Sequence, residues 1–246
     1  MDNTKNLGES APATEQSGAS ISKNVSHSED AKAEGFYTVT CTAPIEEMRD
    51  EYIALLDRIQ RLKNTSHLPK PIAIVANILN KRSILNLEEE LAQIPLVEKW
   101  VDTVPNTVTT VGKNYLLDNG LAGSAFTAAF YLGLISSVTY TAISAADTMS
   151  SHTGWVEAGS ANVPIYSQSA RPTAAWSSAS AGSKAFSSAL SFTIATTGGT
   201  VKGCFLTTVA TKDGTTGTLY SAGLFSGGDK VVAVADTLNV TYTASL

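Results

Sequence analysis

Residues 217–246, GTLYSAGLFSGGDKVVAVADTLNVTYTASL, decide the fold of this chain. From Leu238 onward every second residue is apolar, and Asn, Thr and Ser occupy the positions between. Strict alternation of this kind is typical of a β-strand with one buried face. The apolar positions are Leu238, Val240, Tyr242, Ala244 and Leu246. We therefore predict that the chain ends in a half-buried strand.

Similar short apolar runs extend upstream to about residue 105, and several are separated by turn signals such as Gly198-Gly199 and Asp213-Gly214. Many short strands with turns between them favour an antiparallel sandwich or jelly roll. We predict a mainly β domain over residues 105–246. The candidate strands are Thr107–Val111, Phe126–Ile135, Val138–Ile143, Leu190–Ala195, Val201–Thr208, Thr218–Phe225, Lys230–Ala235 and Leu238–Ser245.

Before Pro105 the chain is richer in charge, and Pro44–Lys63 is its best helix. Acidic residues follow Pro44 and basic residues precede Asn64, which suits the helix dipole. Apolar residues spaced by three and four form a stripe along it: Ile45, Met48, Tyr52, Leu55, Ile59 and Leu62. The stripe fits a helix packed on its own domain, and it also fits a short seam at an oligomer axis.

Residues 36–104 are expected to form a small helical docking or oligomerisation region that starts with a β-like piece, Phe36–Thr42. An apolar run at Ile72–Leu79 and a capped segment at Leu87–Gln93 predict two more helices, the second of them continuing through Leu96–Val101. Residues 1–35 are polar and nearly free of large apolar side chains, so we predict an extended N-terminal arm that orders on a partner.

Composition argues against several classes of protein. The net charge of −5 does not suit nucleic-acid binding. Cys41 and Cys204 are expected to be free thiols in a reducing compartment, and no metal or cofactor motif occurs. The first residues lack a signal-peptide pattern, so none is expected. The uncharged stretch Leu121–Ala146 is long enough for a membrane span, but its scattered Gly, Ser and Thr favour a buried strand.

Two catalytic arrangements were weighed. His152 and Asp147 with a nearby serine would make a triad, but no nucleophile elbow is present. A carboxylate pair for glycoside hydrolysis would have to come from Asp102, Asp118, Asp147, Glu157, Asp213, Asp229 and Asp236. Asp236 is better explained as a turn residue that binds local backbone N–H groups. We predict that the chain is not an enzyme.

Aromatic side chains offer a binding alternative. Trp155, Tyr166 and Trp176 are flat amphipathic rings that suit a glycan surface, and they suit the core of a β-domain equally well in chemical terms. The core is the favoured interpretation.

The C-terminal half carries a recognisable order of short segments. They are Trp155, RPTAAW at 171–176, LSFTI at 190–194, TVKGCFL at 200–206, GTLYSAG at 217–223 and DTLNVTY at 236–242. Together they resemble a module of small structural proteins of tailed bacteriophages, found in head decoration, head fibre and tail fibre-like proteins. The resemblance covers about residues 106–246.

This resemblance implies a non-enzymatic virion structural protein, a capsid decoration or head-fibre component, assembled in the cytoplasm of a bacterial host. It would oligomerise through its β-domain, as a homotrimer, and bind the major capsid protein or a neighbouring virion protein through its arm and helices. The alternative is a tail-associated appendage that binds a receptor or a glycan.

Overall fold

The computed structural model describes residues 33–65, 67–121 and 130–245. All but the last three residues of the expected N-terminal arm, 1–35, lie outside this range. The description below concerns the described residues of the unit Lys32–Leu246.

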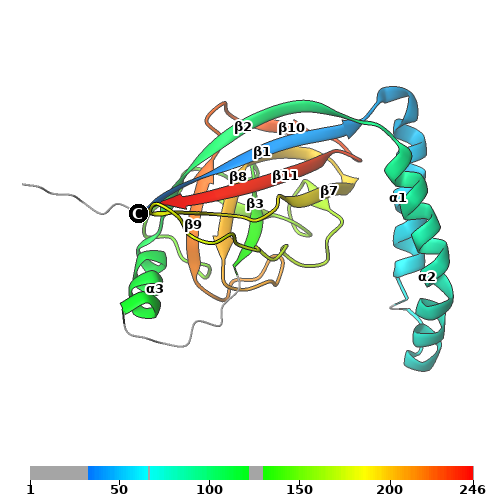
Figure 1. Cartoon of the computed structure of the whole chain (residues 1–246), viewed down its shortest axis with the longest axis horizontal. Coiled ribbons are helices and arrows are strands. Elements are labelled where there is room, and N and C mark those ends of the chain that lie inside the picture. Colours follow the sequence, from blue (N-terminus) through cyan, green and yellow to red (C-terminus); the bar gives the residue numbers. More distant parts are fainter. Residues whose placement is uncertain (1–32, 66, 122–129, 246) are drawn as a thin grey trace, which may run out of the picture. The chain divides into compact units, whose positions relative to one another are not determined.

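The described chain is mainly β, as the sequence predicts (Figure 1). Three α-helices accompany the strands: α1 (Arg49–Lys63), α2 (Lys70–Gln93) and α3 (Thr110–Leu121), with a 3-10 turn at Glu46–Met48. The strands are β1 (Glu34–Pro44), β2 (Leu96–Val108), β3 (Tyr131–Ser136), β4 (Val156–Ala158), β5 (Ile165–Tyr166), β6 (Ser183–Ala185), β7 (Leu190–Thr197), β8 (Gly199–Thr207), β9 (Leu219–Leu224), β10 (Lys230–Val232) and β11 (Thr237–Ser245).

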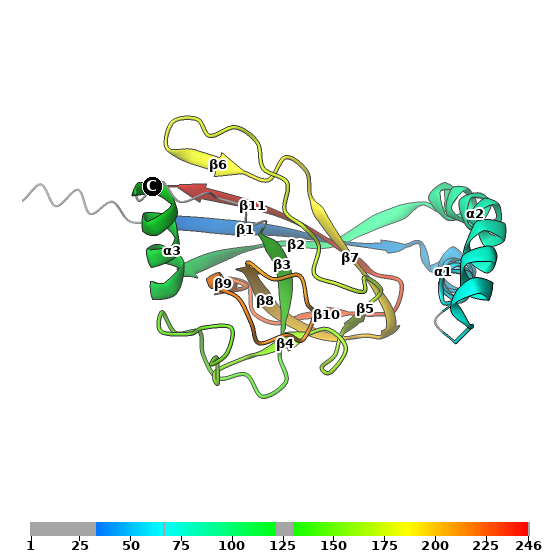
Figure 2. The ribbon, with the colours of Figure 1, turned by 90° about the horizontal axis from the view of Figure 1, so that it is seen from below.

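All named strands join one antiparallel sheet in the order β4-β3-β8-β9-β2-β1-β11-β7-β5, with β10 on β8 and β6 on β11. The two ends of this order approach each other. The Ser136 hydroxyl at the end of β3, the neighbour of the terminal strand β4, donates to the Val163 carbonyl just before β5, at 2.7 Å. The sheet therefore nearly closes into a barrel, and the views in Figures 1 and 2 show the strands wrapping around one interior. Near-closure leaves few unpaired strand edges.

The predicted last strand is confirmed as β11, and its apolar face is buried. Leu238 and Val240 are fully buried and Tyr242 is 1% exposed, whereas Thr241 faces solvent. β1 pairs with it from Glu34↔Ser245 to Thr42↔Thr237, so the first and last described strands lie side by side. Tyr37, Val39 and Cys41 of β1 point into the same core.

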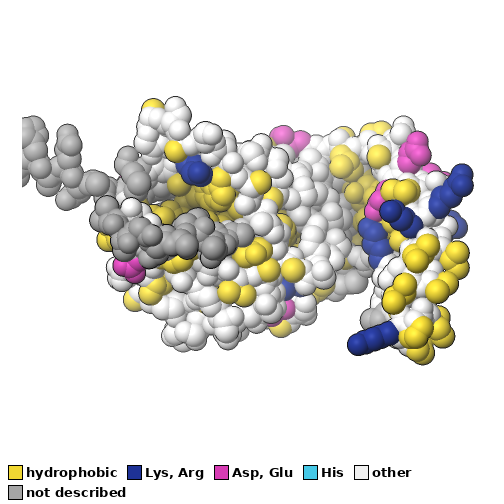
Figure 3. Space-filling view, turned by 60° about the horizontal axis from the view of Figure 1, so that its bottom comes forward, with side chains coloured by type: hydrophobic (Ala, Val, Ile, Leu, Met, Phe, Trp, Pro, Cys, Tyr) yellow, Lys and Arg dark blue, Asp and Glu magenta, His cyan; other side chains and the backbone are white. Residues whose placement is uncertain are grey.

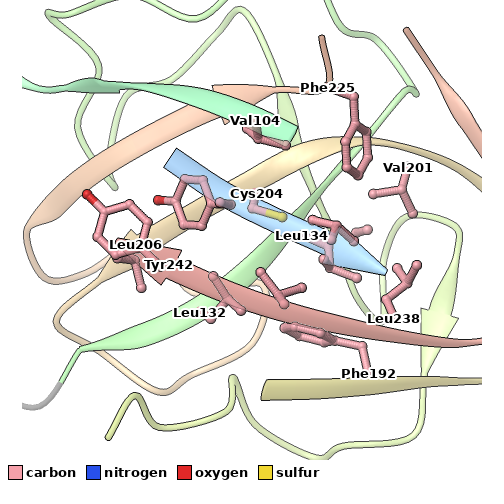
Figure 4. Close-up of a cluster of buried hydrophobic side chains, with 14 of the residues drawn as sticks. Val104, Leu132, Leu134, Phe192, Val201, Cys204, Leu206, Phe225, Leu238 and Tyr242 are labelled. Atoms are coloured by element: carbon pink, nitrogen blue, oxygen red, sulfur yellow. The ribbon is translucent and has the colours of Figure 1, made fainter. Parts of the chain in front are cut away.

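The barrel interior is filled by large apolar side chains from strands on every side (Figure 4). Those with no exposed surface include Leu132, Leu134, Phe192, Cys204 and Leu206. Burying an aliphatic or aromatic side chain of this size contributes about 1.5–3 kcal/mol. The core therefore belongs to the barrel, and the helices pack outside it.

The helices α1 and α2 are an insertion in a β-hairpin. β1 and β2 pair with each other from Phe36↔Pro105 to Pro44↔Leu96, and the Ile45 N–H donates to the Pro95 carbonyl at 3.2 Å where the insertion begins and ends. The two predicted helices at 72–79 and 87–93 are one continuous helix, α2. Asn86, the residue before the expected second helix and its expected N-cap, therefore lies inside α2 and does not cap a helix.

The predicted helical continuation over Leu96–Val101 is wrong, because this segment is the first half of β2. Pro95 cannot continue the helical hydrogen bonds, and the free edge of β1 offers backbone partners instead. The expected boundary between residues 104 and 105 falls within this strand.

The predicted strand at Val138–Ile143 is also wrong. Thr139 has a φ of 54°, outside the strand region, and the segment is a turn at residues 138–139 followed by irregular chain. Part of the uncharged stretch 121–146 is outside the described residues; among the helices that are described, none is long and apolar enough to cross a membrane.

Because β1 and β2 pair directly, the barrel should fold without the helical insertion. A chain in which an Asn-Gly turn replaces residues 46–93 is expected to keep its β-rich far-UV spectrum and to unfold cooperatively. Its midpoint in urea should be lower, because contacts at the base of the helices are lost. Absence of a cooperative transition would show that the helices are needed for the fold.

Candidate functional site

The base of the α1–α2 hairpin is held to the barrel by a buried carboxylate, Asp236, in the turn that precedes β11. Its side chain has no exposed surface. Arg49, from the start of α1, donates to Oδ1 at 2.7 Å, and Lys99, from β2, donates to Oδ2 at 2.5 Å. The Ala233 N–H also donates to Oδ2, at 2.9 Å. The expected bond from local backbone is therefore present, and two cations that the sequence analysis did not assign join it.

Apolar contacts reinforce this base. Tyr52 of α1, Ile94 after α2 and Ala235 beside the ion cluster form one buried group. Cys41 of β1 lies beside Asp236. Burial raises the pKa of the Cys41 thiol to about 12, and the Asp236 carboxylate adds to this shift. The thiol therefore stays protonated and unreactive at neutral pH. Cys204 is also fully buried, and burial raises the pKa of its thiol as well.

The stripe on α1 is covered within the chain. Tyr52 and Ile59 are buried, and the other four residues, Ile45, Met48, Leu55 and Leu62, are half-buried. The α1 stripe thus packs against the chain's own α2 and barrel. Its participation in contacts between chains stays a prediction.

The surface that α1 leaves uncovered is on α2. Ala73, Ala76, Asn80, Ile84, Leu87 and Leu91 form the buried or half-buried side of α2. The Asn80 amide donates to the Leu62 carbonyl of α1 at 3.0 Å. The remaining sides carry six aliphatic residues that are each more than half exposed: Ile72, Ile74, Val75, Ile78, Leu79 and Leu85, here called the α2 outer face. Figure 3 shows hydrophobic side chains gathered on this hairpin, with Lys and Arg beside them.

Sequence reasoning missed the α2 outer face, although a signal for it was present. The segment PIAIVANIL at 71–79 is apolar on nearly every side of a helix, so it shows little helical periodicity. A helix that is apolar all round is normally buried, either in the core of a large protein or in a membrane. The absence of periodicity was therefore itself the indication of a helix with several neighbours.

The barrel holds a second buried ion pair, between Glu157 of β4 and Arg171. The guanidinium donates to Oε1 at 2.9 Å and to Oε2 at 2.7 Å, and also to the carbonyls of Val209 and Gly214. The Asp213 N–H donates to Oε2 at 2.9 Å. Burial raises the pKa of Glu157, and Arg171 opposes that shift. The pair ties β4 and the loop that carries Arg171 to the loop between β8 and β9.

Two of the carboxylates weighed for glycoside hydrolysis, Glu157 and Asp213, are thus brought together. The Glu157 oxygens are occupied by Arg171 and by backbone, and the side chain is 7% exposed. The Oδ2 atom of Asp213 accepts from the Ser160 N–H at 2.8 Å. These contacts brace loops and present no open carboxylate pair to a substrate.

His152 and Asp147 do not form a catalytic pair here. Asp147 accepts from the Trp155 indole at 2.8 Å and from the Ser144 N–H at 3.0 Å. The His152 ring stacks on Trp155 with centroids 4.1 Å apart, and its Nδ1 lies 2.9 Å from the Trp155 carbonyl oxygen. This arrangement anchors a buried tryptophan.

Of the three candidate glycan contacts, two are in the core: Trp155 is 1% exposed and Tyr166 is 2% exposed. Trp176 is half-buried at the edge of an aromatic cluster, with its ring centroid 4.9 Å from that of Phe186 and 5.9 Å from that of Tyr242. Among the residues with described positions, no group of three or more His, Cys, Asp or Glu could hold a metal ion.

Comparisons with known proteins found no match to this chain among family models, curated proteins or solved structures. Its function therefore has to be argued from the geometry above.

The Asp236 cluster gives a stability prediction. Asp236→Asn leaves Arg49 and Lys99 without their carboxylate, and breaking a buried ion pair of this kind costs about 3–5 kcal/mol. Urea unfolding monitored by tryptophan fluorescence measures the loss. The matched control is Asp229→Asn, which removes a 2.9 Å pair with Lys202 at a carboxylate 40% exposed, and this should cost only about 0–1 kcal/mol. Equal losses in the two variants would contradict the assigned role of Asp236.

Proposed function

We propose that this chain is a non-enzymatic structural protein of a tailed-bacteriophage particle, a capsid decoration or head-fibre component that works by assembly. The observation that carries the proposal is the exposed aliphatic surface of α2 on a hairpin anchored to a nearly closed barrel. Exposed apolar patches of this kind mark interaction sites. The resemblance of residues 106–246 to phage structural modules supports the particle as the setting.

The buried polar groups of the barrel also support a structural role. The carboxylates of Asp236, Glu157 and Asp147 are each engaged by cations, indole or backbone N–H groups. Such fully satisfied groups stabilise a fold, whereas catalytic carboxylates need access to a substrate. In this proposal the barrel is a rigid body, the hairpin is a docking element, and the N-terminal arm attaches the protein to the major capsid protein or a neighbouring virion protein.

The proposal predicts that the chain is part of a particle. Density-gradient purification of particles from the host that carries this sequence should recover the full-length protein at a fixed stoichiometry, measured by quantitative mass spectrometry. A chain that lacks residues 1–32 keeps β1 intact and should fold, yet its amount in particles should fall at least tenfold. Equal incorporation of the truncated chain would refute attachment through the arm, and absence of the full chain from particles would refute the function itself.

A second function, glycan binding by a tail appendage, is favoured by one groove. It has a volume of about 710 Å³ and lies between the last turns of α1 and the β5–β7 edge. Polar groups line both sides, among them Gln60 and Arg61 of α1 and Ser167 and Ser169 of the barrel. Amide, guanidinium and hydroxyl groups are suitable hydrogen-bond partners for sugar hydroxyls.

The groove gives its own prediction. If it binds a glycan, a glycan array should identify a ligand for the full chain, and Gln60→Ala with Ser169→Ala should weaken its binding at least tenfold by calorimetry. Asn86→Ala, on α2, is the control and should bind as the wild type does. An array without any ligand would remove this alternative.

A further inference from the structure

We infer that the α2 outer face is the surface through which copies of this chain associate, with the helical hairpin of one copy covering the hairpin of another. The inference rests on the proposed assembly role and names the partner of its docking element. It places the contact between copies on α2, a surface that the described part of the chain leaves open, and not on the β-domain or on the α1 stripe, which the chain itself covers.

The exposed residues form two rows along the helix. Ile72, Val75 and Leu79 follow one row, and Ile74, Ile78 and Leu85 follow the other. At 3.6 residues per turn the rows lie about 110° apart, and each lies roughly 120° from the side that packs on α1. α2 therefore has apolar rows on three sides, and α1 occupies one of them. A partner that covers both remaining rows needs two helices, or one helix on each side.

The size of the face fits a specific protein interface. Six aliphatic side chains that are each more than half exposed present on the order of 400 Å² of apolar surface over ~20 Å of helix. A standard interface buries about 800 Å² per partner, a little over half of it apolar. The face therefore supplies the apolar part of one standard interface.

Charge favours a second copy over a membrane or a nucleic acid. Residues 46–93 contain seven Lys and Arg against eight Asp and Glu, so the hairpin is nearly neutral. Helices that lie on anionic membranes carry an excess of Lys and Arg on their polar side. Two nearly neutral hairpins meet without net repulsion.

The polar residues on this face are self-complementary as well. Exposed Arg82 and Glu89 lie between the two apolar rows, so each copy offers a cation to the anion of another. The α1–α2 hairpin of a second copy is itself a pair of helices, each long enough to span the ~20 Å of this face. Identical copies are the commonest partners in soluble assemblies.

Cross-linking tests the contact in the intact protein. Cys41 and Cys204 are fully buried, so Leu79→Cys introduces an accessible thiol at a position 71% exposed. A short bismaleimide added at micromolar protein should convert this variant to covalent dimers of twice the 25.7 kDa chain mass. Val231→Cys is the matched control, also 71% exposed but on β10 of the barrel, and it should stay monomeric on the gel. Equal cross-linking of both variants, or of neither, would overturn the inference.

Light scattering gives the second readout. Wild-type protein at tens of micromolar should have the mass of two or more chains. The double variant Ile78→Lys with Leu79→Lys should have the mass of a single chain and an unchanged far-UV spectrum. Val231→Lys should leave the oligomer intact. A monomeric wild type, a double variant that keeps the wild-type mass, or sedimentation of the wild type with anionic vesicles would each overturn the inference.

The two proposals can fail separately. Recovery of a monomeric protein in purified particles would refute only self-association through α2. If the wild type is an oligomer that the double variant disperses, but purified particles do not contain the protein, only the virion function would be refuted.

Discussion

The structure depends on the pairing of β1 with two strands that are far away in sequence. Phe36 lies opposite Thr243 of β11 on one side and opposite Pro105 of β2 on the other. This backbone ladder joins the start of the described chain to its end and brings the two halves of the sheet together. Each buried backbone group left without this pairing would cost about as much as a lost hydrogen bond. β1 thus holds β2 and β11 together in the interior of the strand order, and the sheet can curve into a nearly closed barrel.

The same ladder decides where the helices sit. Residues 46–93 are inserted between the paired ends of β1 and β2, so the base of the helical hairpin is tied to the barrel at two adjacent points. Asp236 then couples this base to the last strand through Arg49 and Lys99. Burying a carboxylate costs its hydration free energy, and the two cations around Asp236 offset this cost. An unpaired buried carboxylate would have nothing to offset it. The hairpin is thereby anchored to the barrel, with the aliphatic side of α2 left open.

A nearly closed barrel with an anchored, partly apolar hairpin suits a protein that acts by joining others. The barrel presents few free strand edges, so uncontrolled sheet pairing is limited. Contacts can then be confined to helical surfaces, whose geometry selects partners through the spacing of side chains. Satisfied ion pairs such as Glu157–Arg171 keep the connecting loops in place and leave the contact surfaces to aliphatic residues.

Local patterns in the sequence determined the mainly β class, the last strand and its buried face, and the helix over 49–63, because alternation and helical spacing are properties of neighbouring residues. Other features required the tertiary structure. Leu96–Val101 became a strand because β1 offered it an edge, and Val138–Ile143 became a turn and irregular chain despite its apolar content. The ion cluster at Asp236 joins residues more than a hundred positions apart. Local spacing carries no information about such partners, since only the closed sheet brings them within bonding distance.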